Sequence, residues 1–235
     1  MIDLLLPAVL STTAGAVDVV GFLALGGLFT AHITGNLVVL AAHYVTGGFS
    51  EMGPLLAAPV FILVLGAVTV AAVGLEKTRC GSRRALLLLQ AVLLAGCLAI
   101  GAGFGPFHDP DCPTAVLTGM LGVAAMATQN ALVRLALPGA PSTAVMTTNI
   151  TQFAVDVATV VRGVTEPEAL TRARHRAGVT FPSMVGFLVG CASGAFLEIH
   201  IGLWALALPV VLAALALTLD ELKSDRATSP NVVAA

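Results

Sequence analysis

The sequence predicts an all-α, polytopic membrane protein with about six transmembrane helices, arranged as two inverted three-helix repeats with additional short, broken or re-entrant helices. Three observations support this prediction: the composition, a polar motif that occurs twice, and the positions of the basic residues. Of the 235 residues, 57% are hydrophobic and only 10% are charged, whereas a soluble domain is usually about a quarter charged. A soluble fold of this composition would have too few charges to cover its surface, so the chain is expected to lie in a bilayer.

Apolar runs along the chain are long enough to form helices that cross a membrane. They fall at about 4–28, 33–46, 54–75, 84–105, 114–137, 143–161, 178–199 and 201–219. One crossing needs about 20 apolar residues, and several of the runs reach that length. Helices are expected rather than a barrel, because a barrel would show short strands of alternating polarity.

A polar cluster near the start of the chain returns 113 residues later. Thr34-Gly35-Asn36 corresponds to Thr147-Thr148-Asn149, and Thr30-Ala31 corresponds to Thr143-Ala144. The chain is therefore interpreted as duplicated, with its polar residues placed alike in both halves.

The basic residues set the direction of the helices. Residues 76–84 contain Lys77, Arg79, Arg83 and Arg84, and residues 162–176 contain Arg162, Arg172, Arg174 and Arg176. By the positive-inside rule both connections face the cytoplasm, whereas 46–53 and 106–113, which contain no Lys or Arg, face outward. Corresponding helices of the two halves then run in opposite directions, as in many transporters. Both chain termini are placed in the cytoplasm.

The first unit of each half is expected to contain a break. Block 114–161 starts outside, ends inside and is too short for three crossings, so one full helix with a half-helix or re-entrant segment fits it and its counterpart 4–46. The breaks are predicted at Leu25-Gly26-Gly27 and at Pro138-Gly139-Ala140-Pro141, because Gly and Pro end helices. We predict one membrane domain over 1–222, with repeats at about 4–105 and 114–220, and a disordered cytoplasmic tail at 223–235.

Asp18 lies in the middle of an apolar run, where an ionised carboxylate costs about 2.5–3.5 kcal/mol. It is expected to face a cavity or a partner, with Arg134, Thr34 and Asn36 as the candidates. One interpretation is a carboxylate that couples proton or ion movement to a solute, or contacts the solute directly. The other is a hydrogen bond or an ion pair with Arg134 that ties two helices together or acts as a gate.

Further polar side chains at the two breaks complete the candidate site. The Thr and Asn residues of the repeated motif stand where short apolar helices begin, and free N–H groups there favour an anion or a polar solute. Helix capping would explain the same residues. Gln129 and Asn130 lie deeper in a helix and indicate a lined cavity, whereas Arg134 could merely reach lipid phosphates. The predicted solute-binding residues are Asp18, Thr34, Asn36, Gln129, Asn130, Thr147 and Asn149.

Other features of the chain predict packing rather than chemistry. Gly186, Gly190 and Gly194 form a ridge of small residues that permits close helix packing, within the chain or at a dimer contact. His32 is interpreted as a packing histidine that could also titrate near neutral pH. No metal site, other cofactor or enzymatic activity is predicted, because no metal-ligand spacing and no nucleophile with an adjacent base is found in the sequence. The lack of like-charge blocks gives no reason to expect nucleic acid.

Two groups of these residues carry a family resemblance. Ala14-Gly15-x-x-Asp18 is followed by Thr34-Gly35-Asn36, and Gln129-Asn130-Ala131-x-x-Arg134 is followed by Thr143 and Thr147. With these motifs the chain resembles, to about residue 222, the YoaK family of bacterial inner-membrane proteins, a domain of unknown function. The resemblance implies a transporter-like protein with six spans in the bacterial inner membrane, although Thr148-Asn149 stands where many relatives are expected to have Thr-Gly.

Together these features predict an inner-membrane transporter or channel for a small polar or anionic solute, with a mid-membrane site at the two broken segments and proton coupling through Asp18. The alternative hypothesis is a non-transporting scaffold that binds a partner through the glycine ridge and the Arg-rich loop. The expected partners are membrane lipids, a small-molecule solute and, through the ridge, a second copy of the chain.

Overall fold

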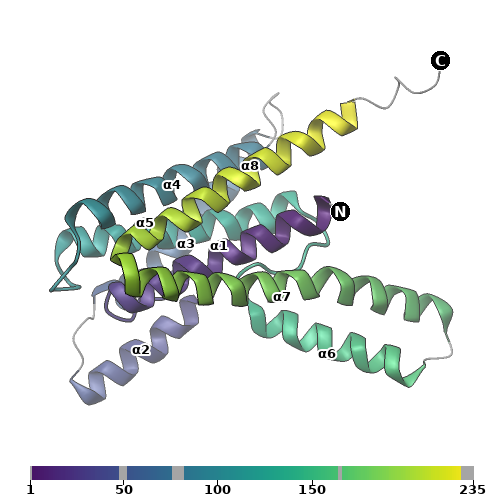
Figure 1. The fold of residues 1–235 in the computed structure, drawn as a ribbon, viewed down its shortest axis with the longest axis horizontal. Helices are drawn as coiled ribbons and strands as arrows, with labels where there is room; N and C mark the ends of the chain where they lie inside the picture. Colours follow the sequence, from purple (N-terminus) through teal and green to yellow (C-terminus); the bar gives the residue numbers. More distant parts are fainter. Residues whose placement is uncertain (1, 48–51, 76–81, 164–165, 229–235) are drawn as a thin grey trace.

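The computed structural model describes residues 2–47, 52–75, 82–163 and 166–228, and all regular structure in these ranges is helical (Figure 1). The helices are α1 (Ile2–Ala24), α2 (Ile33–Thr46), α3 (Met52–Leu75), α4 (Ser82–Phe104), α5 (Pro113–Ala136), α6 (Met146–Arg162), α7 (Pro167–Ile201), the 3₁₀ helix η1 (Gly202–Leu206) and α8 (Ala207–Thr228). Within the described ranges no strand is present, as the sequence predicts.

Five helical segments are long and apolar enough to cross a membrane: Leu4–Ala24, Met52–Ala72, Ser82–Phe104, Pro113–Ala136 and Pro167–Lys223, the last of which contains α7, η1 and α8. The α1 and α5 segments are 67% buried inside the protein, whereas the more apolar α3 segment is only 17% buried. An outer helix that is more apolar than the central ones is what a lipid surrounding requires. The architecture is that of a multi-pass membrane protein.

Helices at equivalent places in the two halves of the chain have equivalent neighbours. α1 packs along α7 and α5 along α3, α4 packs on α5 and α8 on α1, and α2 contacts α3 as α6 contacts α7. In Figure 1, α1, α4 and α7 run from right to left, whereas α3, α5 and α8 run from left to right. Each long helix of the first half therefore runs opposite to the helix four places later.

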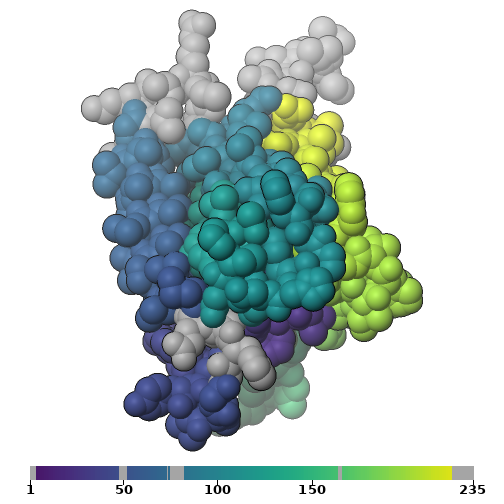
Figure 2. Space-filling view, turned by 90° about the vertical axis from the view of Figure 1, so that its left-hand side faces the viewer, coloured from purple at the N-terminus to yellow at the C-terminus, as the bar shows by residue number. Residues whose placement is uncertain are grey.

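The short helices α2 and α6 lie on the same side of the bundle and diverge from its centre toward opposite ends (Figure 1). Figure 2 shows α2 projecting beyond the long helices at the lower edge. α6 is tied to α7 by an ion pair, with Nη2 of Arg176 2.6 Å from Oδ1 of Asp156. The Arg176 guanidinium holds the pKa of the Asp156 carboxyl below its usual range.

Both predicted breaks are confirmed. α1 ends at Ala24, and Gly26 and Gly27 follow with φ of 66° and 82°. α5 ends at Ala136, and Gly139 follows with φ of 81°. Residues other than glycine rarely adopt positive φ, so these glycines let the chain reverse toward the bundle centre.

Two sequence-based boundaries are wrong. The segment before residue 178, expected as part of an Arg-rich connection, is helical from Pro167. A proline in the first turn and the pair formed by Arg172 and Glu168, 3.2 Å apart at i and i+4, favour this helical extension. At the other end, α8 continues to Thr228 instead of giving way to a tail at 223, and the rest of the predicted tail lies outside the described residues.

The ridge of α7 glycines lies against α1 within the chain. A Cβ added at Gly190 would lie 2.1 Å from the carbonyl oxygen of Thr12, and one added at Gly186 would lie 2.6 Å from that of Ala8. Gly15 of α1 is matched in return, because a Cβ there would lie 2.3 Å from the carbonyl oxygen of Phe187. The α1 and α7 backbones are therefore in close contact, and the ridge is covered by α1.

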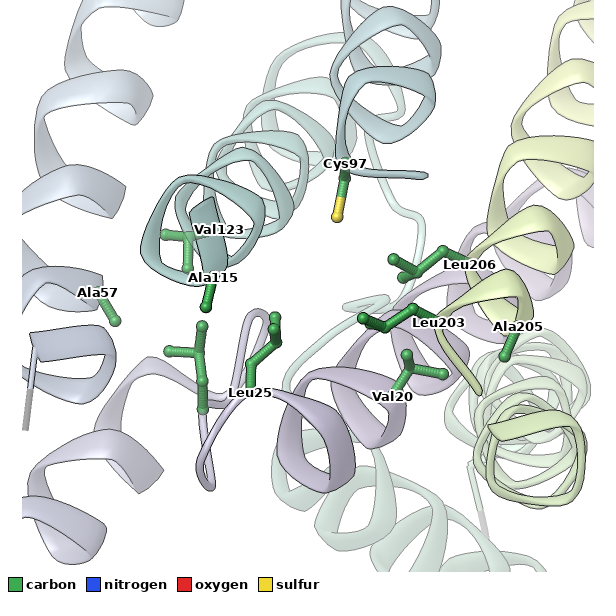
Figure 3. Packing of buried hydrophobic residues seen from close by; sticks show 10 residues of the cluster. Val20, Leu25, Ala57, Cys97, Ala115, Val123, Leu203, Ala205 and Leu206 are labelled. Carbon is green, nitrogen blue, oxygen red and sulfur yellow. The ribbon is translucent and has the colours of Figure 1, made fainter. Parts of the chain in front are cut away.

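An apolar cluster closes the bundle near the α1 break. Its buried members come from α1, the following loop, α3, α4, α5 and η1, as Figure 3 shows: Val20, Leu25, Leu28, Ala57, Cys97, Ala115, Val123, Leu203, Ala205 and Leu206. Leu28 lies against Gly119 of α5, where an added Cβ would lie 2.4 Å from a Leu28 methyl carbon. The loop that leaves α1 is therefore packed inside the protein, which fixes the residues that follow it.

Candidate functional site

Asp18 is buried on α1, and the chain after α1 folds back over its carboxylate. Oδ1 accepts hydrogen bonds from the backbone N–H of Ala31 at 2.7 Å and from the hydroxyl of Thr30 at 3.2 Å. Oδ2 lies 2.5 Å from Nδ1 of His32. Both carboxylate oxygens have partners, which offsets part of the cost of removing the charge from water.

A pocket of about 400 Å³ opens beside the carboxylate and the imidazole. Its lining includes Asp18, Phe22, Phe29, His32, Thr34, Phe187 and Cys191. The His32 side chain is 35% exposed whereas that of Asp18 is 5% exposed, so the imidazole is the part of the pair that meets the open space. The volume lies within the range of about 300–1,000 Å³ that is usual for small-molecule sites.

Aromatic rings form much of the wall of this pocket. The His32 ring meets the Phe187 ring edge-on, with centroids 5.4 Å apart. The Phe22 and Phe29 rings lie 4.9 Å apart. The pocket thus combines a carboxylate–imidazole pair with apolar rings.

The repeated asparagines hold the two loops in shape. The Asn36 amide accepts from the backbone N–H of Phe29 at 2.8 Å and donates to the carbonyl of the same residue at 2.7 Å. In the second half, the Asn149 amide donates to the carbonyl of Ser142 at 2.6 Å. Ser142 follows Phe29 by the same 113 residues that separate Asn149 from Asn36, so each asparagine clamps the residue seven positions before it through hydrogen bonding. Neither acts as a side-chain N-cap, because α2 and α6 begin after His32 and Val145.

Asn36→Ala is expected to lower the free energy of unfolding by about 1–3 kcal/mol, because it leaves the Phe29 N–H and carbonyl without partners. Asn149→Ala removes a single backbone hydrogen bond and should fall at the lower end of that range. Thermal unfolding of the purified variants measures both. Thr147→Ala, at an exposed position on α6, is the control and should melt like the unmodified protein. Equal melting of all three variants would contradict the clamp.

Gln129 of α5 contacts the second loop, as Asp18 of α1 contacts the first, although the two residues do not correspond at the 113-residue offset. Its Nε2 donates to the Thr143 hydroxyl at 2.9 Å and to the Leu10 carbonyl at 3.0 Å. Its Oε1 accepts from Nε2 of Gln90 at 2.6 Å. The Thr30 hydroxyl donates to Asp18, whereas the Thr143 hydroxyl accepts from Gln129, so a threonine of each loop meets a polar side chain of the preceding long helix. Of these two helix side chains only Asp18 can ionise.

The remaining predicted residues lie elsewhere. Asn130 donates to the Met126 carbonyl on its own helix at 2.8 Å, and Thr147 is exposed. Arg134 is exposed near the end of α5. The predicted ion pair between Asp18 and Arg134 is absent from the described residues, because the reversed loop supplies Thr30, Ala31 and His32 as the partners of Asp18 instead.

Of the seven predicted solute-binding residues, Asp18 and Thr34 line the pocket. Asn36 fixes the adjacent loop, and the direct contact with a solute that the sequence predicts for the others stays a prediction. Sequence analysis missed the phenylalanine walls and gave His32 a packing role. The recurrence of Thr30 as Thr143 was a usable signal for the loop contact, whereas no pattern in the sequence indicated that Phe187 of α7 would face the break.

The titratable side chains of the pocket are Asp18, His32 and Cys191. No hydrogen bond joins the Cys191 thiol to His32 in the described part of the chain, so the three side chains do not form a linked nucleophile and base. Among the described residues no group of three or more His, Cys, Asp or Glu side chains is placed to hold a metal ion.

The fold and this pocket define a helical multi-pass membrane protein with a titratable pair at a break in its first helix. A family model matches residues 6–219, and the chain belongs to that family, which is described as a protein of unknown function (DUF1275). The comparison with curated proteins and the comparison with solved structures each gave no match. The family description assigns no activity, so the function is inferred from the site.

Proposed function

We propose that this protein is a membrane transporter or channel of the inverted-repeat type, which binds a small polar solute in the pocket beside Asp18 and His32 and couples its movement to a proton on that pair. The observation that carries the proposal is the buried carboxylate whose imidazole partner opens into a pocket. Transport rather than catalysis is proposed, because proton exchange needs no nucleophile linked to a base.

The arrangement of the helices supports two inverted repeats with six crossings, by α1, α3, α4, α5, α7 and α8. Equivalent helices have equivalent neighbours and run in opposite directions (Figure 1). The short helices α2 and α6 start at the centre of the bundle, where transporters with inverted repeats bind their solutes. Ala31 and Ala144, one from each loop, belong to one buried cluster with Ala14 and Met126, which supports a meeting of the two breaks inside the bundle.

The basic residues support a cytoplasmic position for one end of the bundle. The described Lys and Arg residues lie at the starts of α4 and α7 and near the ends of α5, α6 and α8. These helix ends are on the right-hand side of Figure 1, as is the start of α1. By the positive-inside rule that side is cytoplasmic, and we propose that both termini lie there. A bacterial inner membrane, which the YoaK resemblance implies, is part of the same proposal.

The scaffold hypothesis names two contact surfaces, the glycine ridge and the Arg-rich loop, and the first of them is covered within the chain. The glycine ridge that would have bound a partner is in contact with α1 of the same chain. If the contact between Asp18 and His32 were only a structural hydrogen bond, the exposure of His32 to the pocket would have no role. A pair that binds a solute needs that exposure.

Asp18→Asn tests the proposal, because the amide oxygen can still accept from Ala31 and Thr30 while the charge is lost. We expect a solute from a broad panel, used at about 100 times its dissociation constant, to stabilise the unmodified protein by about 2.7 kcal/mol. That stabilisation should change with pH between about 5 and 8, where an imidazole titrates. In Asp18→Asn the His32 imidazole loses the carboxylate that raises its pKa, so the pH dependence should shift to lower pH, both in thermal unfolding and in uptake into proteoliposomes.

The matched control is Thr159→Ala, which alters a partly exposed polar residue of α6 whose hydroxyl donates to the carbonyl of Val155 on its own helix. It should bind the solute with the pH profile of the unmodified protein. Unchanged binding, uptake and pH dependence in Asp18→Asn would refute the coupling role, and a panel without any stabilising solute would turn the search toward protein partners.

A further inference from the structure

A larger pocket, of about 790 Å³, opens at the end of the bundle that carries the basic residues. Four basic side chains from three helices line it: Arg83 of α4, Arg174 and His175 of α7, and Lys223 of α8. Most other lining residues are apolar, among them Leu4, Leu6, Leu137 and Val179, and no lining residue is acidic. The pocket is separate from the Asp18 site, with which it shares no lining residue.

The level of this pocket in the bilayer follows from the ends of the candidate membrane spans. Those spans begin at Leu4 and end at Ala136 and Lys223, and all three residues line the pocket. The pocket therefore lies where the helices leave the hydrocarbon layer, which is the level of lipid headgroups. An occupant meets apolar side chains toward the bundle and basic side chains at the rim.

The arginines of α7 differ in their partners. Arg172 pairs with Glu168 at 3.2 Å, and Arg176 pairs with Asp156 at 2.6 Å. Arg174, between them, has no carboxylate partner among the described residues and lines the pocket. Arg83 of α4, which also lines the pocket, is paired with Asp220 of α8. A guanidinium without a carboxylate beside an acid-free pocket favours an anion, and phosphate matches its paired N–H groups.

We propose that this pocket binds an anionic phospholipid from the cytoplasmic leaflet. The headgroup phosphate lies between Arg174 and Lys223 with Arg83 behind it, and the start of the acyl chains packs on Leu6, Leu137 and Val179. A free phosphate or another small soluble anion would satisfy the basic rim but leave the apolar part of the pocket unfilled. Bound lipid would tie together α1, α5, α7 and α8 at this end of the bundle.

The test compares three probes on the delipidated full-length protein: phosphatidylglycerol, phosphatidylcholine and inorganic phosphate. Thermal unfolding and native mass spectrometry measure stabilisation and retained lipid. Phosphatidylglycerol is expected to stabilise the protein and remain bound, with apparent affinity reduced about fivefold by Arg174→Gln and further by Arg174→Gln with Lys223→Gln, since one basic residue at a lipid surface contributes about that factor. Arg172→Gln is the matched control on the same helix and should bind like the unmodified protein.

Three results would overturn the proposal. Equal stabilisation by phosphatidylcholine would mean that the headgroup charge is not recognised. An equal loss in Arg172→Gln and Arg174→Gln would assign the effect to the general positive surface rather than to the pocket. Stabilisation by inorganic phosphate to the same extent would assign the pocket to a soluble anion. None of these results depends on whether the Asp18 pocket binds a solute.

Discussion

Gly190→Ala is expected to lower the free energy of unfolding by about 3 kcal/mol, at the upper end of what overpacking usually costs. The new methyl group would lie 2.1 Å from the Thr12 carbonyl oxygen. Because that atom belongs to the backbone, no side chain can move aside, and α1 and α7 must separate. Gly190→Leu is expected to leave little folded protein. Detergent-solubilised yield on size exclusion and the unfolding midpoint measure both effects.

Gly178→Ala is the control for that experiment, because it lies on the same helix with nothing within 4 Å of an added Cβ. In a helix interior alanine is favoured over glycine by about 1 kcal/mol, so this variant should be as stable as the unmodified protein or more so. If Gly190→Ala and Gly178→Ala melt alike, the α1 and α7 backbones are not in contact.

Asp18→Ala is expected to destabilise the protein by about 3–5 kcal/mol, the usual cost of removing one partner from a buried charged pair. The backbone N–H of Ala31 and the hydroxyl of Thr30 would lose their acceptor, and His32 would lose the carboxylate that orients its ring. The loop that closes over α1 would then have fewer contacts to hold it. The unfolding midpoint in detergent measures the loss.

Asp18→Asn provides the comparison, because it keeps an oxygen acceptor of the same shape. It should retain most of the stability that Asp18→Ala loses while shifting the pH dependence of solute binding to lower pH, because the His32 imidazole loses the carboxylate that raises its pKa. A variant series in which alanine and asparagine destabilise equally would mean that the charge, rather than the hydrogen bonds to the loop, holds the break together. No destabilisation in either variant would contradict the burial and bonding of this carboxylate.

The helices and their breaks follow closely from local sequence. A run of apolar residues in a bilayer must satisfy its backbone internally, so it becomes a helix wherever its neighbours lie. The helices end near Gly26, Gly27 and Gly139, because these residues adopt positive φ. The glycine and proline residues around these positions make the two breaks visible in the sequence. The start of α7 was missed because its first turns are polar and are stabilised by contacts between side chains, including Asp156 on another helix.

The candidate site was predictable in part. Asp18 was predictable because a carboxylate in an apolar run is costly unless it has a partner or a cavity. Thr34 and Asn36 were predictable because their motif occurs twice in the sequence. The partner of Asp18 did not stand out, since Arg134 and His32 are both polar residues that could reach a carboxylate in an unknown fold. The loop after α1 folds back and places His32 beside the Asp18 carboxylate. The close packing of α7 on α1 brings Phe187 to the same pocket.

The sequence by itself determined that this is a helical membrane protein, that a polar motif recurs along it, and that its first and fifth helices end close to glycine. These properties depend on composition and on residues close together in the chain. Only the tertiary structure decided that the Asp18 carboxylate meets His32, that the asparagines clamp loops, and that the glycine ridge is covered. Those outcomes depend on which helix surfaces pack against each other. That packing is decided jointly by residues that lie far apart in the sequence.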